Sequence, residues 1–77
     1  MPHLYMVSWI SEEVEPIPSV IEAGTDGEAA RDYAILEILP LHSTVLVTSA
    51  EAQQSYWRYE ESACRGVRVS ELSNFVR

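Results

Sequence analysis

The strongest constraint on this fold is a short apolar run that leads directly into a helix start signal. The run contains the β-branched residues Val20 and Ile21, which favour a strand. Thr25 and Glu28 follow with the spacing of a capping box, in which the hydroxyl accepts from the amide three residues on and the carboxylate accepts from the amide of the cap. Because the two signals adjoin, we expect a helix packed on a sheet.

The helix that this signal predicts runs from Asp26 to Leu39. Glu28, Arg31 and Asp32 mark its solvent side. Pro40 ends it, because the residue before a proline is disfavoured in the helical region. The apolar face, which recurs at helical spacing, comprises Ala29, Ala30, Tyr33, Ala34, Leu36 and Ile38.

The stretch from Ala50 to Cys64 has two interpretations. The pattern T-x-x-E-A-x-x-x-Y of residues 25–33 occurs again at 48–56. A helix here would place Ala52, Tyr56, Tyr59 and Ala63 on one face and would end at Gly66. The alternative is a strand over 55–60 paired with 45–48, which the run Tyr-Trp-Arg-Tyr suits. Residues 50–54 contain no Gly, Asn, Asp or Pro for a tight turn, so the helix is favoured.

Apolar and alternating runs predict strands at 4–10, 45–48 and 67–69, with a turn after the first of these. Pro16 and Pro18 confine the segment before Val20 to an edge or irregular strand. The predicted order is β-β-α-β-α-β. We therefore expect the α/β (α+β) class, with a small mixed sheet of about four strands and two helices on one face, in a single domain spanning 1–77.

The length of 77 residues limits the core. A chain of this size buries roughly 60% of its unfolded surface, so its net stability is small. Cys64 is the one cysteine, and no Cys/His cluster has metal-ligand spacing. We therefore expect no disulfide within the chain, no metal and no cofactor. Stability must then come from a well-packed core or from a second subunit.

The sequence shows no targeting signal, and we therefore expect a cytoplasmic protein. The first residues have no basic region, no apolar run approaches the length of a membrane span, and a lone thiol fits a reducing compartment.

The charge of the chain is acidic and uneven. Twelve acids face five arginines and no lysine, which gives a net charge of −7. Residues 1–61 carry a balance of −9, whereas residues 62–77 carry +2 through Arg65, Arg68 and Arg77 against Glu71. Such a charge opposes contact with a phosphate backbone. It favours solubility and a positively charged partner, either the basic end of another copy or a different protein.

No arrangement of residues indicates an enzyme. His3 and His42 have no Cys, Asp or Glu at a meaningful spacing, and a reactive Cys64 beside Arg65 is less expected than a packing residue. The glycines match neither a P-loop nor a dinucleotide fingerprint. We therefore predict a protein without catalytic activity.

Binding residues are better indicated. On the favoured second helix, Trp57 lies off the apolar face among polar residues, where it could anchor an interface; the alternative is that it packs in the core. Arg58 beside it offers a planar donor. The carboxylates expected to steer a basic partner are Glu12, Glu13, Glu15, Asp26, Glu28 and Asp32.

One resemblance bears on function. The stretches Val20 to Ala23 and Gly27 to Ala34, followed by the strand 45–48, resemble the small acidic inhibitors made by bacterial viruses, including the anti-CRISPR proteins. The resemblance implies a non-enzymatic inhibitor that occupies a basic, nucleic-acid-binding surface of a host defence complex in the bacterial cytoplasm. It carries no functional residue over to this chain.

Two functional hypotheses follow. In the first, the acidic face competes for the arginines and lysines that would hold phosphates, as a mimic of DNA. In the second, the chain is a homodimeric interaction module, because a small sheet leaves an uncovered edge and the basic end could meet the acidic part of another copy.

Overall fold

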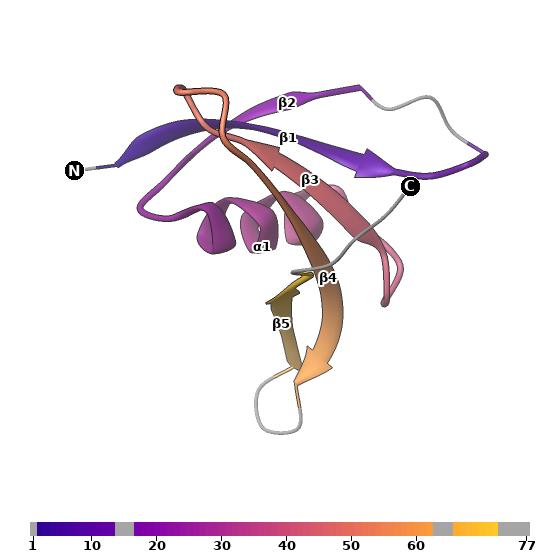
Figure 1. The fold of residues 1–77 in the computed structure, drawn as a ribbon. Helices are drawn as coiled ribbons and strands as arrows, with labels where there is room; N and C mark the ends of the chain where they lie inside the picture. The colour runs from indigo at the N-terminus through magenta and orange to yellow at the C-terminus, as the bar shows by residue number, and fades with distance from the viewer. Residues whose placement is uncertain (1, 14–16, 63–65, 73–77) are drawn as a thin grey trace.

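One antiparallel sheet and one helix make up the described part of the chain (Figure 1). The structure is a computed structural model that describes residues 2–13, 17–62 and 66–72. The fold is α+β, and the strand order is β2-β1-β3-β4-β5. The elements are β1 (His3–Ile10), β2 (Ser19–Ala23), α1 (Asp26–Leu36), β3 (Thr44–Thr48), β4 (Gln54–Ser62) and β5 (Gly66–Glu71).

The helix covers one face of the sheet, which we call the helix side. Side chains alternate between the two faces of a strand, so Val7, Val45 and Val47 point toward the helix, where they are fully or almost fully buried. Trp57 and Tyr59 of β4 lie on the same side. The opposite face, which we call the open face, carries no helix in the segments that the structure describes (Figure 1). The helix contributes Ala29, Ala30, Tyr33 and Ala34 to the core.

Several predictions of the sequence are confirmed. Strands occupy the three ranges expected for β1, β3 and β5, and β2 is an edge strand, as the preceding prolines predict. The helix begins at Asp26, as predicted, with the Thr25 half of the predicted capping box. The Thr25 hydroxyl accepts from the Glu28 amide at 3.2 Å. The Glu28 carboxylate accepts from the Gly24 amide at 3.0 Å, one residue before the cap.

The helix ends at Leu36 rather than at the predicted Leu39. The Leu39 amide donates to the Ala34 carbonyl at 3.0 Å, and the Ile38 amide donates to the Ile35 carbonyl at 3.2 Å. These are the two bonds of a Schellman motif, and Ile38 takes the left-handed conformation that the motif requires, with φ of 52°. The turn carries Leu39 into the core, where it is 8% exposed.

The predicted second helix is wrong, because residues 54–62 form strand β4. A five-residue loop at 49–53 joins it to β3, whose Thr48 pairs with Gln54. Ala52 takes a left-handed conformation, with φ of 63°, without being glycine or asparagine. Its amide donates to the Ser49 carbonyl at 3.0 Å, and the Ser49 amide donates to the Gln53 carbonyl at 2.8 Å. A hairpin therefore forms without the residues usually needed for one.

The sheet also differs from the one predicted. It has five strands instead of about four, and every pairing is antiparallel instead of mixed. Because 54–62 is a strand, Gly66 begins β5 and does not end a helix. Among the described residues, no helix is long and apolar enough to cross a membrane.

Candidate binding site at the start of the helix

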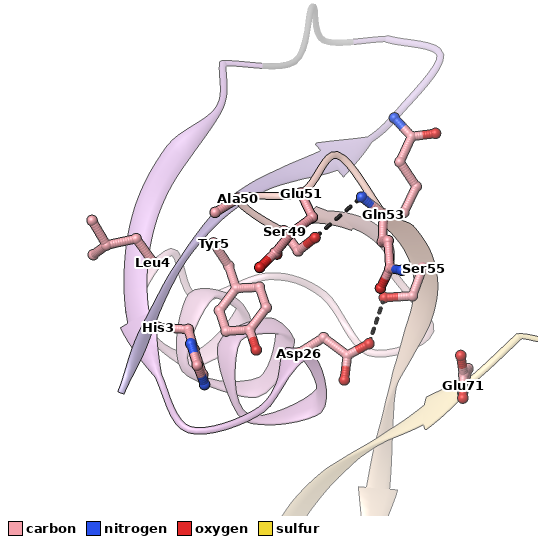
Figure 2. A pocket seen from close by; sticks show the side chains of 11 residues that line it. His3, Leu4, Tyr5, Asp26, Ser49, Ala50, Glu51, Gln53, Ser55 and Glu71 are labelled. Atoms are coloured by element: carbon pink, nitrogen blue, oxygen red, sulfur yellow. Dashed lines mark hydrogen bonds between the residues drawn. The ribbon is translucent and has the colours of Figure 1, made fainter. Parts of the chain in front are cut away.

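A pocket of about 540 Å³ lies where the helix begins, on the helix side of the sheet (Figure 2). Four parts of the chain that are distant in sequence meet there: the start of β1, the first residue of α1, the β3–β4 hairpin and the end of β5. The lining residues are His3, Leu4, Tyr5, Asp26, Ser49, Ala50, Glu51, Gln53, Gln54, Ser55 and Glu71.

Asp26 is held in place by a chain of hydrogen bonds that starts at Trp57. The Trp57 indole nitrogen donates to the Ser55 hydroxyl at 2.8 Å. That hydroxyl donates to Asp26 Oδ2 at 3.0 Å (Figure 2), while Asp26 Oδ1 accepts from the Gly27 amide at 2.9 Å. Both carboxylate oxygens therefore have a donor, and the negative charge lies at the positive end of the helix dipole.

Gly27 allows the helix to approach the sheet at this point. A Cβ atom placed on Gly27 would lie 3.0 Å from the Trp57 ring, which is closer than carbon atoms pack. The ring therefore occupies the space that a side chain at this position would fill. The close contact sets the position of the first helical turn over β4.

The hairpin supplies the opposite wall of the pocket. The Ser49 hydroxyl accepts from the Gln53 amide at 3.1 Å (Figure 2), which adds to the backbone bonds of the loop. Figure 2 shows Glu51 on this loop and Glu71 on β5, with Asp26 on the helix. Glu71 pairs with Trp57 across β4 and β5, so it lies on the helix side.

The pocket is acidic. Among the residues that the structure describes, its lining includes three carboxylates, on Asp26, Glu51 and Glu71, and no arginine. The exposed side of α1 continues this charge, because Glu28, Asp32 and the C-cap Glu37 are all exposed. Hydroxyl and amide groups in the lining add neutral acceptors. A ligand that carries a guanidinium or ammonium group fits this chemistry better than an anion does.

The predicted site residues separate into distinct places. Asp26 lines the pocket, and Glu28 and Asp32 are exposed on the helix that starts there. Glu12 and Glu13 are exposed beyond the end of β1 that is far from the pocket. Glu15 lies outside the described residues.

Trp57 and Arg58 are not neighbours on one surface. The expectation that Trp57 stands exposed on a helix is wrong: it is half-buried on β4 and packs against the helix start, as the alternative of core packing stated. Arg58, the next residue, points to the open face because adjacent strand residues alternate. Whether either residue binds a partner stays a prediction.

Glu51, Glu71, Ser55 and Tyr5 were not identified from the sequence. Their places depend on the hairpin and on the pairing of β4 with β5, which the favoured second helix excluded. The signal that could have found Ser55 and Glu71 was the strand alternative for 55–60. In that reading Ser55 shares a face with Trp57, two residues on.

Within the described ranges, no three His, Cys, Asp or Glu side chains are grouped so that they could hold a metal ion. His3 is exposed and meets Tyr5 edge-on, with ring centroids 6.3 Å apart. His42 is exposed in a turn with φ of 71°. Cys64 lies outside the described residues. The absence of catalysis stays a prediction.

Comparison with protein-family models, with curated proteins and with solved structures gives no match to this chain.

Proposed function

We propose that this chain is a non-enzymatic binding protein that occupies a basic, nucleic-acid-binding surface of a partner protein. The observation that carries the proposal is the pocket, whose described lining has three carboxylates and no arginine, together with the acidic exposed side of α1. An arginine or lysine of the partner would enter the pocket, and the helix carboxylates would meet the charges around it.

The charge distribution supports one binding face. The helix and its C-cap carry four carboxylates, on Asp26, Glu28, Asp32 and Glu37, against Arg31. On the open face, Glu22 and Glu60 are balanced by Arg58 and Arg68. A basic partner is therefore attracted to the helix side, and this attraction raises the association rate at low salt.

The hydrogen bonds around Asp26 support binding without a large rearrangement. The carboxylate is oriented before a ligand arrives, by Ser55 and by the Gly27 amide. Less side-chain freedom is then lost when a cation binds. The bound partner would lose its own contacts with phosphates, and this competition would inhibit it.

The test uses a fluorescent arginine-rich peptide, with its dissociation constant measured by anisotropy at low salt and at about 0.5 M salt. The double variant Glu51→Gln/Glu71→Gln should weaken binding about tenfold. The matched control, Glu12→Gln/Glu13→Gln, has the same net charge. The sequence predicted that these carboxylates steer a partner, but they lie far from the pocket, so the constant should change less than about twofold.

Equal losses in the two variants would contradict a specific site, because total charge alone would then explain the binding. Binding that does not change with salt would contradict mimicry of nucleic acid. The host defence complex as the partner and the bacterial cytoplasm as the location rest on the resemblance and on the sequence, and they stay predictions.

A further inference from the structure

The open face of the sheet carries an exposed apolar patch beside an acidic corner. Leu4, Met6 and Val20 are 58%, 51% and 64% exposed. They are neighbours, because Met6 pairs with Val20 across β1 and β2, and Leu4 is two residues from Met6 on the same face. Leu4 also pairs with Glu22, which places this carboxylate at the edge of the patch. We call these four residues the β1–β2 corner.

Arg58 and Arg68 form a second corner of the same face, which we call the basic corner and which lies diagonally opposite the β1–β2 corner. Thr48 pairs with Met6 on one side and with Gln54 on the other. These three paired residues form a row across the sheet that begins at the β1–β2 corner. Arg58 is four residues farther along β4, toward the opposite end of the sheet. Arg68 pairs with Glu60 beyond it. Leu46 of the central strand lies between the two corners, opposite Ser8 and Tyr56.

The open face is the side on which a second copy meets the least repulsion. Among the described residues its charges are balanced, whereas those of the helix side are acidic, and the whole chain has a charge of −7. Arg58 is exposed and forms no ion pair with any residue that the structure describes. Arg68 is bonded to Glu60 at 3.2 Å. Glu22 and Arg58 are thus opposite charges on one face, too far apart across the sheet to meet within one chain.

We infer that the open face binds a second copy of this chain about a two-fold axis at Leu46. Two-fold symmetry makes an interface self-complementary. An axis between the sheets that exchanges the two corners places Glu22 of each copy opposite Arg58 of the other. The strands of the two sheets then cross at nearly a right angle, which is one of the two ways that sheets pack face to face. Met6 and Val20 would cover the aliphatic part of the arginine side chains.

The inference does not depend on the proposed function, since the pocket carboxylates lie on the helix side and the charges of the proposed dimer lie on the open face; Leu4 is the one named residue that borders both surfaces. In such a dimer both helices point outward, so each assembly presents two acidic faces. A partner with two basic sites would then bind more tightly through both than through one.

Sedimentation velocity of the full chain tests the inference, at protein concentrations from about 1 to 200 µM and with a reducing agent that keeps Cys64 from linking copies. We expect a species of twice the chain mass of 8.7 kDa. Glu22→Arg and Arg58→Glu should each raise the dimer dissociation constant at least about tenfold, because each puts like charges together in two places. The double variant Glu22→Arg/Arg58→Glu exchanges the two charges and should restore the dimer.

The control is Asp32→Arg, which makes the same charge change as Glu22→Arg but on the helix, and should leave the dimer intact. Circular dichroism of each variant separates a lost interface from a lost fold. A wild-type chain that remains a monomer over the whole range would overturn the inference. A dimer that neither single variant weakens, or that the exchanged pair does not restore, would overturn this choice of face.

Discussion

Residues 25–33 and 48–56 follow the same pattern, T-x-x-E-A-x-x-x-Y, and fold differently. In the first, Thr25 caps α1 and Glu28 returns to the Gly24 amide. In the second, Thr48 ends β3, and the residues after it form the loop of a hairpin. A capping box is therefore permissive: it stabilises a helix that the following residues already favour.

The residues beyond the pattern decide the outcome. After Glu28 come residues whose apolar members recur at helical spacing, and four of them are buried against the sheet. In the segment after Glu51, every second side chain of β4 points to the helix side of the sheet, including Trp57 and Tyr59. A cap contributes about 1 kcal/mol, whereas burying an aromatic side chain contributes about 1.5–3 kcal/mol. The burial of two aromatic residues in β4 outweighs the cap signal at Thr48.

Tyr33 and Tyr56, the last residues of the two patterns, should differ most in how much their replacement by alanine lowers the free energy of unfolding. Tyr33 is 4% exposed in the core, whereas Tyr56 is half-buried on the open face. Tyr33→Ala should lower the free energy of unfolding by about 3–5 kcal/mol, since it leaves a cavity. Tyr56→Ala should lower it by about 1 kcal/mol. Urea denaturation at low protein concentration measures both, and similar losses would contradict the difference in burial.

Ala29 and Ala52, the fifth residues of the two patterns, should change the stability in opposite directions when each is replaced by glycine. Ala29 is fully buried in the helix, so Ala29→Gly should cost about 1–2 kcal/mol through lost helix propensity and a lost methyl group. Ala52 has φ of 63°, which glycine adopts without strain, so Ala52→Gly should stabilise the fold by about 0.5–1 kcal/mol. Thermal unfolding of both variants provides the measurement. A destabilised Ala52→Gly variant would show that the turn is not strained.

Glu28 and Glu51, the fourth residues of the two patterns, should show a smaller difference in the stability lost on replacement by alanine. Glu28→Ala removes the bond to the Gly24 amide and a charge near the helix start, and should cost about 0.5–1 kcal/mol. Glu51→Ala removes the same charge from an exposed loop and should stay within about 0.5 kcal/mol of the wild type. Denaturation midpoints at equal salt compare them. Equal costs would mean that Glu28 acts only through net charge.

The helix and four of the strands could be predicted because their signals are local. The cap at Thr25, the alternation in β1 and the prolines before β2 each act within a few residues. The β3–β4 hairpin could not be predicted in this way, because Ala52 carries no sequence sign of its left-handed conformation. The helix end was misplaced for the same reason: Ile38 takes a conformation that an isoleucine rarely adopts.

The candidate site was less predictable than the fold. Its acidic character follows from composition, and Asp26 was identified as a site residue. Ser55 and Glu71 reach the pocket only through the pairing of β4 with its neighbours. Trp57 and Arg58 lie on opposite faces because side chains alternate along a strand. The predicted helix over residues 50–64 would have placed neighbouring side chains only about 100° apart.

The smallest expected effect concerns the Tyr33 hydroxyl at high pH. Burial raises its pKa above the ordinary value of 10.0; a hydrogen bond with the Trp9 backbone opposes this, and the charge of Glu37 adds to it. The unfolded chain then releases this proton first, so the stability is complete below about pH 10 and is lost as the pH rises through the folded-state pKa.

Tyr33→Phe should therefore reduce the fall in stability between about pH 9 and 11, although it costs about 1 kcal/mol at neutral pH through the lost hydrogen bond. The chain has no lysine, so no lysine side chain titrates in this range to obscure the effect. Urea denaturation at intervals across the range measures the slope for both proteins. Parallel curves would show that the Tyr33 proton is not coupled to folding, and that the tyrosine closing the first pattern stabilises the helix through its ring alone.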